Sequence, residues 1–279
     1  MSARRKDPVT APSRAATART LADLDELVTT CRACPRLVAW REAVAAAPRA
    51  SFADWTYWGR PVPGFGPADA RIAIVGLAPA AHGANRTGRM FTGDRSGDFL
   101  FAALHRVGLA SQPYSVSADD GLTLTDVRIT APVRCAPPAN KPTTLERDTC
   151  APFLSRELEL LAPTVRVALV LGGFGWHALL GTLARSGWAI PRPRPVFGHG
   201  ATAVVSRGAQ RLTLLGCFHV SQQNTFTGRL TPDMLDSILL RALDLAGGVG
   251  ASEGLRSAPS DGAERKRALG GRSRSRSAT

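Results

Sequence analysis

The strongest constraint on the fold is a set of four apolar runs, each separated from the next by a segment with helical spacing. Continuous runs of Val, Ile and Leu, without a polar residue at every second position, are typical of parallel strands buried on both faces. The runs lie at residues 71–79, 127–135, 165–173 and 211–221. Strands that alternate with helices predict an α/β fold, a three-layer αβα sandwich around a central, mainly parallel four-stranded sheet. A fifth strand near residues 200–208 is left open, because periodicity does not settle it.

The segments between and after these runs carry helix signals. Thr143 and Glu146 form a capping-box pattern, and Pro232 stands at a typical first helical position. The predicted helices span residues 97–109, 143–164, 174–187 and 231–248. Ligands of α/β proteins bind beyond the carboxyl ends of strands, where residues 76–94 and 219–232 form two polar loops. We therefore expect the functional cleft between these loops.

The composition is that of one globular domain with basic tails. The chain has 279 residues, is 44% hydrophobic and carries a formal net charge of +13. Residues 1–20 and 248–279 are basic and poor in large hydrophobic side chains, so we expect disordered tails around a single domain at residues 21–247. No run reaches the roughly 18 apolar residues of a membrane span, and no signal-peptide core is present. We expect a cytoplasmic monomer.

The charges are unevenly distributed within the domain. Residues 160–232 contain seven arginines and no Asp or Glu. A solvated surface normally mixes both signs of charge, so an acid-free stretch favours a face that meets phosphates. The alternative is chance in a chain rich in Ala and Arg.

Four of the five cysteines form a pattern that is typical of metal ligands. Cys31 and Cys34 make a C-x2-C pair, and Cys135 and Cys150 follow with 14 residues between them. Without a secretory signal, disulfides are not expected. Widely spaced third and fourth thiolates suit a four-cysteine iron–sulfur cluster at least as well as zinc, while unrelated buried thiols remain the other alternative. Cys217 lies inside an apolar run and is predicted to be core.

Several motifs together resemble one enzyme family. They are "YWGRPVPGFGP", "GLAPAAHGANRTGRMFTGD", "VRCAPPANKPT" and "HVSQQNTFTGRLT", in this order and with the C-x2-C…C-x14-C spacing. This combination resembles the iron–sulfur uracil-DNA glycosylases, specifically family 5, also called type b, over roughly residues 22–246. The resemblance implies the uracil-DNA glycosylase-like fold, DNA containing uracil as partner, and a [4Fe–4S] cluster with Cys31, Cys34, Cys135 and Cys150 as ligands.

The same resemblance explains a missing acid in the first loop. Other branches place a polar, water-activating residue just after the first glycine of the loop, where this chain has Leu77 and Ala78. The enzyme would then act mainly by stabilising the departing uracil anion, because general-base catalysis typically contributes only about 10²–10⁴-fold.

The resemblance assigns roles to residues of the pocket. His219 is expected to donate a hydrogen bond to uracil O2, and Asn85 to hold the attacking water without deprotonating it. Phe91 is expected to stack on the base, and Asn140 to read its edge in place of the Asn that some branches carry before the third cysteine. The predicted base pocket comprises Gly76, Ala78, His82, Phe91 and Asn140, with a helix-capping role as the alternative for His82.

A second group of residues is predicted to bind DNA. The loop at residues 221–230 resembles the segment that enters the minor groove as the nucleotide is flipped out. Its expected contacts are Gln223, Asn224, Thr225, Gly228 and Arg229, and phosphates are expected at Arg86 and Arg89. The glycines of "GGFGWH" at 172–177 are not expected to bind a dinucleotide, since no acid follows at the required distance; they are expected to approach a phosphate or a neighbouring strand.

The leading interpretation is a monofunctional, nucleoid-associated DNA glycosylase that flips and excises uracil, and other deaminated bases such as hypoxanthine, in base excision repair. Strand cleavage through a Schiff-base nucleophile is not expected. The alternatives are a uracil-only family 4-like enzyme, a variant that crosslinks to the abasic sugar, a non-catalytic iron–sulfur nucleic-acid-binding protein and an electron-transfer protein.

Overall fold

The computed structural model describes residues 11–247, which contain one sheet of five strands. The strands are β1 (Ile72–Val75), β2 (Val127–Thr130), β3 (Val167–Leu171), β4 (Thr202–Arg207) and β5 (Gln210–Cys217). Their order across the sheet is β2-β1-β3-β5-β4, and all neighbours are parallel except β4 and β5. The four predicted strands and the mainly parallel sheet are confirmed. The sheet has five strands rather than four, because residues 202–207 add an antiparallel edge strand.

The fifth strand escaped a firm prediction for a physical reason. Strand β4 lies at the edge and only Val205 is fully buried on it, whereas every residue of β1, β2 and β3 is buried. Burial on both faces demands a continuous apolar run, and an edge strand tolerates Thr, Ser and Arg.

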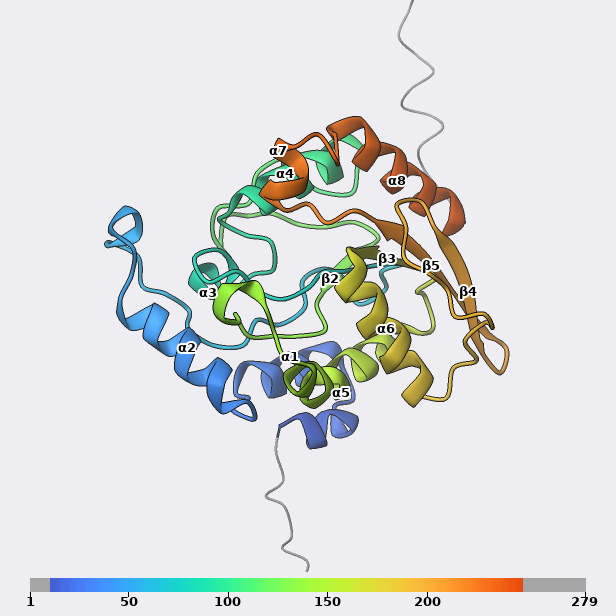
Figure 1. The fold of residues 1–279 in the computed structure, drawn as a ribbon, viewed down its shortest axis with the longest axis horizontal. Helices are drawn as coiled ribbons and strands as arrows, with labels where there is room; N and C mark the ends of the chain where they lie inside the picture. The colour runs from blue at the N-terminus through green and yellow to red at the C-terminus, as the bar shows by residue number, and fades with distance from the viewer. Residues whose placement is uncertain (1–10, 248–279) are drawn as a thin grey trace, which may run out of the picture. The chain divides into compact units, whose positions relative to one another are not determined.

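Helices cover both faces of the sheet (Figure 1). The longer helices are α1 (Leu21–Thr29), α2 (Pro35–Ala46), α4 (Arg95–Arg106), α5 (Thr144–Leu161), α6 (Gly173–Arg185) and α8 (Pro232–Leu245). The short elements are η1 (Pro12–Thr17), η2 (Ala50–Phe52), α3 (Ala84–Thr87), η3 (Pro138–Asn140) and α7 (Gln222–Phe226). Helices α4 and α8 pack on one face and α5 and α6 on the other, which confirms the three-layer sandwich.

The pleat of the strands divides the core between the two faces. Ile72 and Ile74 of β1 pack with the α4 and α8 side, while Ala73 and Val75 pack with the α5 and α6 side. This period of two follows from strand geometry. Because β1, β2, β3 and β5 are parallel, their carboxyl ends all lead into loops at the same edge of the sheet.

Both predicted helix starts are present. The Thr143 hydroxyl accepts a hydrogen bond from the Glu146 N–H at 3.2 Å, and the Glu146 carboxylate accepts one from the Thr143 N–H at 2.7 Å. Helix α8 begins at Pro232, and Thr231 caps it. These caps satisfy N–H groups that the helix itself leaves unpaired.

The prediction of a disordered tail is wrong for residues 11–20. They form η1 and lead into the Thr20 cap of α1, with Ala15 and Ala18 buried against α1 and α5. The Arg156 guanidinium donates to the Ala18 carbonyl at 2.7 Å. Small alanine side chains allow this close packing, although they carry little hydrophobic signal in the sequence. The rest of the predicted tails, at 1–10 and 248–279, lies outside the described residues.

Within residues 11–247, no helix is both long and apolar enough to cross a membrane.

Candidate active site and cysteine centre

A cavity of about 310 Å³ lies at the carboxyl edge of the sheet. This volume is at the lower end of the range for small-molecule sites. The lining residues come from the loops after β1, β2 and β5: Leu77, Ala78, Pro79, Ala80, Ala84, Met90, Phe91, Asp94, Ser96, Ala131, Asn140, His219 and Ser221. The structure thus brings together four residues that sequence patterns placed in one pocket, namely Ala78, Phe91, Asn140 and His219.

The loop after β1 is shaped by close backbone contacts around Phe91. Phe91 adopts a left-handed φ of 52°, which is strained for a bulky residue and is most often seen at functional sites. A Cβ on Gly76 would lie 3.0 Å from the Phe91 ring, and one on Gly97 would lie 1.9 Å from the Phe91 carbonyl oxygen. Gly76 therefore serves the pocket by admitting the ring of Phe91. Gly175 likewise meets the Gly76 carbonyl, which confirms that a glycine of "GGFGWH" approaches a neighbouring strand.

His219 follows the end of β5 and faces the same cavity. Its ring centroid lies 6.2 Å from that of Phe91. The Asn224 side chain donates to the His219 carbonyl at 2.8 Å and fixes the backbone. Burial lowers the pKa of the His219 imidazole to about 4, so the ring is neutral at physiological pH. A neutral imidazole offers one N–H donor and carries no charge that would have to be desolvated with the base.

Asp94 is the acidic residue of this pocket, and the sequence interpretation gave it no role. It caps α4, where its Oδ1 accepts from the Gly97 N–H at 3.0 Å, and the residue also lines both the cavity and the adjoining groove. Burial raises the pKa of the Asp94 carboxyl. The cap pattern of an Asp before a helix was readable, but its place in the pocket depends on how the loop at residues 76–94 folds back.

Asn85 lies elsewhere than its predicted role requires. Its side chain is fully buried, and its Nδ2 donates to the Arg41 carbonyl at 3.3 Å. It does not line the cavity. The residue joins the loop to α2, so the structure does not place it where an attacking water would be held.

Arg86 and Arg89, predicted to bind phosphates, have partners inside the domain instead. Arg89 is buried, and its guanidinium donates to Asp120, Ser115, Thr92 and the Ala118 carbonyl. All three guanidinium nitrogens therefore have partners inside the domain, and the structure does not present them at the surface where a phosphate was expected.

Arg86 is 4% exposed and lies between the rings of Phe52 and Trp55, 4.0 and 4.1 Å from their centroids. It donates to the carbonyls of His82 and Gly93. The main contacts of Arg86 are therefore inside the domain. The sequence shows an arginine in a polar loop, and this pattern is the same whether the side chain is buried or exposed.

A wide groove of about 1130 Å³ adjoins the cavity. The two share Ala80, Asp94, Ser96, Asn140 and Ser221, so the cavity opens into the groove. His82 lines the groove rather than the cavity, and its Nδ1 lies 3.0 Å from the Tyr57 hydroxyl. Burial lowers the pKa of His82, and the charges of Arg49 and Arg86 lower it further.

The predicted DNA loop forms α7 at one wall of this groove. Gln223 is exposed there and lines the groove. The Thr225 hydroxyl is engaged within the loop, since it donates to the Ser221 carbonyl at 3.3 Å. Gly228, with φ of 70°, and Arg229 are exposed, and the Arg229 guanidinium lies 4.6 Å from the Phe218 ring centroid.

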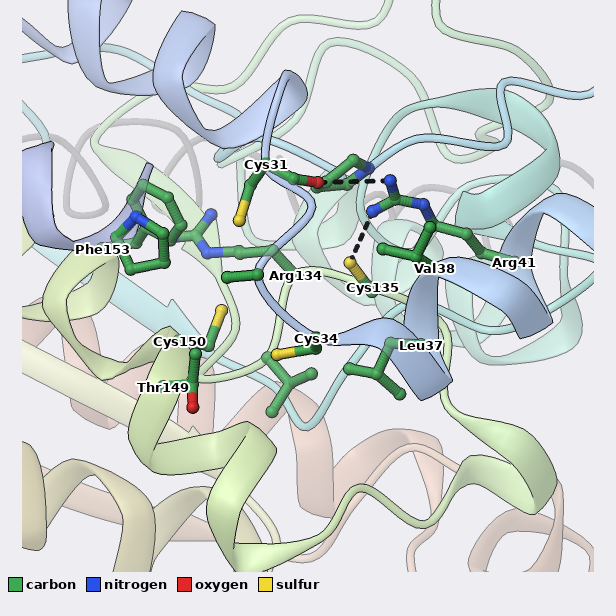
Figure 2. A pocket seen from close by; sticks show the side chains of 14 residues that line it. Cys31, Cys34, Leu37, Val38, Arg41, Arg134, Cys135, Thr149, Cys150 and Phe153 are labelled. Carbon is green, nitrogen blue, oxygen red and sulfur yellow. Dashed lines mark hydrogen bonds between the residues drawn. The ribbon is translucent and has the colours of Figure 1, made fainter. Parts of the chain in front are cut away.

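The four patterned cysteines meet at a second site where the start of α2, capped by Cys34, approaches Cys150 of α5. Figure 2 shows the sulfur atoms of Cys31, Cys34, Cys135 and Cys150 around one shared space. Burial is the main cause that raises the pKa of each of these thiols, to about 11 for Cys34 and Cys135. Cys217 lies apart from them in the core, as predicted.

Two buried arginines flank the cysteines on opposite sides (Figure 2). The Arg41 Nη1 donates to the Cys135 sulfur at 3.0 Å, and the Arg41 Nε has no partner among the described residues. Arg134 pairs with Glu157 through Nη2, but its Nε and Nη1 lack partners within residues 11–247. Unpaired buried N–H groups are costly, so this space is suited to an anionic group.

In the described part of the chain, no three His, Cys, Asp or Glu side chains are grouped as ligands of a single metal ion. A single ion needs ligands at one point, whereas each thiolate of a four-iron cluster binds its own iron. Ala78 of the base cavity packs against the same apolar group as Cys34 and Cys135. The two sites are thus in contact through the core.

Known proteins resemble the chain over most of its length. The family described as "Uracil DNA glycosylase superfamily" matches residues 63–242. A "Type-5 uracil-DNA glycosylase" of Mycobacterium tuberculosis is 57% identical over 230 residues, which are 82% of this chain and 83% of the relative. The protein of the same description from Thermus thermophilus is 51% identical over 222 residues, 80% of this chain and 96% of its own length.

A "Type-4 uracil-DNA glycosylase" of Thermotoga maritima is 36% identical over only 109 residues, 39% of this chain and 49% of the relative. The type-5 proteins therefore match at higher identity and over twice the length. With the geometry of the cavity, these matches show that the chain is a hydrolase of N-glycosidic bonds that belongs to the uracil-DNA glycosylase superfamily, in its type-5 branch.

Proposed function

We propose that this enzyme excises uracil, and other deaminated bases such as hypoxanthine, from DNA during base excision repair, and leaves an abasic site. The observation that carries the proposal is the cavity, in which the stacking ring of Phe91 and the neutral donor His219 meet at the mouth of a groove. A flipped nucleotide requires this combination of an aromatic face, a polar donor and an adjacent channel for the strand.

His219 carries the largest share of catalysis. As the N-glycosidic bond breaks, both bonding electrons leave with the base, and negative charge develops on uracil O2. An N–H donor from the neutral His219 ring stabilises that charge more in the transition state than in the ground state. The low pKa of the ring keeps it neutral, so its role is a hydrogen bond and not proton transfer.

Asp94 replaces Asn85 as the group that acts on water. Asp94 is a lining residue of the cavity, and its raised pKa makes it a better base than an exposed Asp. The water oxygen adds to the sugar C1′ while Asp94 accepts the proton, and the base departs as an anion that takes a proton from solvent. The absence of an acid at Leu77 and Ala78 is therefore compensated from the far end of the same loop.

A tolerant pocket favours a broad range of bases. Leu77, Ala78, Pro79 and Ala131 present apolar surface to the cavity and no side-chain hydrogen-bonding group. Asn140 is exposed, has a left-handed φ of 55° and lines both the cavity and the groove, which supports a role of its amide in reading the edge of a base. An amide both donates and accepts, so it pairs with uracil and with hypoxanthine.

Cys31, Cys34, Cys135 and Cys150 are the proposed ligands of a [4Fe–4S] cluster. Bound there, the cluster would supply a structural crosslink between the start and the middle of the domain. Arg41 supports this assignment: it is 2% exposed, its nearest carboxylate is the half-exposed Glu42 at 3.7 Å, and it donates to a cysteine sulfur. A buried cation without a buried counter-charge fits an anionic thiolate-held group.

The cluster proposal is tested by matched cysteine variants. Cys150→Ser is expected to lose iron and the visible absorbance of a cluster, while Cys217→Ser, which is also a buried cysteine, keeps both. Equal iron content in the two variants would contradict the assignment.

The enzymatic proposal is tested by excision from defined DNA. Anaerobically purified protein is incubated with labelled duplexes that carry one uracil or one hypoxanthine, and hot alkali then reveals abasic sites. Breaks at both bases, weakened in His219→Ala, are expected. Breaks at uracil alone would contradict the broad specificity, and intact strands from protein that still binds DNA would leave a non-catalytic binding protein.

A further inference from the structure

One wall of the groove beside the base cavity is aromatic and has no part in the mechanism above. It is formed by Trp40 of α2 and by Phe52 and Trp55, in the segment that follows α2, with Arg49 among them. Trp40 is 37% exposed, and Arg49 is also exposed. Another part of the lining is polar and carries Gln222 and Gln223 of α7. The two parts therefore differ in chemistry.

The aromatic wall rests on rigid supports. The Arg86 guanidinium lies between Phe52 and Trp55 and donates to the Gly93 carbonyl at 2.8 Å, so it ties their segment to the active-site loop. Trp40 precedes Arg41, whose guanidinium is held by the Cys135 sulfur and the Cys31 carbonyl. The Phe52 and Trp55 rings, which Arg86 holds before binding, therefore lose little conformational entropy when a ligand stacks on them.

The position of the wall limits what can reach it. The cavity and the groove share five lining residues, so a strand that delivers a base into the cavity runs along the groove. A paired duplex presents phosphates outward and keeps its bases stacked inside. Aromatic faces accompanied by arginine are instead the means by which proteins hold unpaired bases. A duplex, whose bases are stacked inside, would therefore leave the exposed aromatic rings of the groove without a base to stack on.

We propose that Trp40 and Trp55 form a stacking site for an unpaired nucleotide of the target strand, with Arg49 on its phosphate. Single-stranded DNA is then a substrate class for which the enzyme has a dedicated subsite. The position of the target base rests on the function proposed above; the stacking site itself does not require that the base be excised.

The test compares binding of single-stranded and duplex DNA. The probes are a fluorescein-labelled single-stranded oligonucleotide without uracil and the duplex of the same sequence. Trp40→Ala is expected to bind the single strand roughly 10-fold more weakly, because each aromatic stack contributes about that factor. Trp40→Phe, which keeps an aromatic face, is expected to retain most of the affinity, and the duplex affinity is expected to stay unchanged.

Trp58→Ala is the matched control. Trp58 is 36% exposed, but its indole donates to the Pro61 carbonyl at 3.1 Å and it does not line the groove. Its loss is expected to leave single-strand binding unchanged. Iron content and thermal unfolding are measured for every variant, since Trp40 lies close to the cysteine site. If Trp40→Ala fails to fold, Trp40→Leu, which keeps an apolar side chain without an aromatic face, replaces it with the same expected selectivity for the single strand.

Each outcome decides the proposal. A selective loss of single-strand affinity that Phe restores supports the stacking site. Unchanged single-strand affinity, or an equal loss on duplex and single strand, overturns it. Uracil excision by the unaltered protein is scored separately on duplex DNA, so a failure of the proposed function is visible even when the binding result supports the subsite.

Discussion

Replacement of Glu157 by Gln probes the charged network that joins the cysteine centre to the sheet. Glu157 is fully buried in α5. One carboxylate oxygen accepts from the Arg128 Nε at 2.6 Å, and the other accepts from the Thr130 hydroxyl at 2.6 Å and from Arg134. Asp25, on α1, is the second carboxylate bonded to Arg128. Two buried guanidinium groups therefore depend on Glu157 for charge compensation.

The size of the effect follows from this geometry. Glu157→Gln keeps the shape but leaves Arg134 without a carboxylate partner among the described residues and leaves Arg128 with Asp25 alone. Removal of one partner from a buried ion pair costs about 3–5 kcal/mol. Because 1 kcal/mol shifts the Tm of a domain of this size by about 2–4 °C, the expected decrease is about 6–20 °C.

The effect also has a defined pH dependence. Burial alone raises the pKa of Glu157, but Arg134 and Arg128 outweigh it and lower the pKa to about 2, from 4.5 in the unfolded chain. A lowered carboxyl pKa stabilises the fold fully above the unfolded value, and the stabilisation is lost as the pH falls towards the folded value. The difference between the unaltered protein and Glu157→Gln should therefore shrink between about pH 4.5 and about pH 2.

The assay is thermal unfolding, followed by circular dichroism at about pH 7 and about pH 3. Glu159→Gln, two residues further along α5, is the control: Glu159 is partly exposed, and its pairs with Arg156 and Arg207 are surface pairs, each worth at most about 1 kcal/mol. A decrease in Tm for Glu157→Gln no larger than for Glu159→Gln, or a difference that does not change with pH, would refute the reasoning.

Three substitutions test the active site. His219→Ala is expected to slow uracil excision by about 10²–10³-fold in single-turnover assays, because the donor to the leaving base is lost; a change below threefold, roughly, would contradict that role. Asp94→Asn is expected to slow excision by about 10²–10⁴-fold, because the base that accepts the proton of water is lost. In the unaltered enzyme the rate should fall at low pH as Asp94 becomes protonated, at a higher pH than for an ordinary Asp because its pKa is raised, and the variant should lack this fall. The same pH–rate profile in both proteins would contradict the role of Asp94 as the base. Asn85→Ala is expected to lower the Tm while the folded enzyme keeps most of its rate, since Asn85 bonds to Arg41; a slow enzyme with normal Tm would restore the water-holding role.

Much of the fold was predictable, because burial leaves a direct mark on composition. Strands β1, β2, β3 and β5 are apolar over most of their length since both faces of the sheet are covered, and α5 begins with its own capping pair. Strand β4 and residues 11–20 were missed in whole or in part, because an edge strand and small alanines carry a weak hydrophobic signal.

Part of the site was predictable for a topological reason. His219, Phe91 and Ala78 follow the ends of parallel strands, and those ends meet at one edge of a sheet. The cysteine spacing similarly predicted that four thiols would gather, and Figure 2 shows them around one space. In both cases the position of the motifs along the chain was combined with the family resemblance that they carry.

The direction in which polar side chains of a loop point was decided by tertiary structure alone. Asn85 turned inward to α2, Arg89 found Asp120 thirty-one residues away, and Asp94 reached both its helix cap and the cavity. A polar group in a loop takes whichever partner the folded backbone brings within hydrogen-bond distance, and the large majority of buried groups take one. Local sequence therefore determined which elements form and where they meet, whereas long-range packing determined which of the polar residues face the substrate.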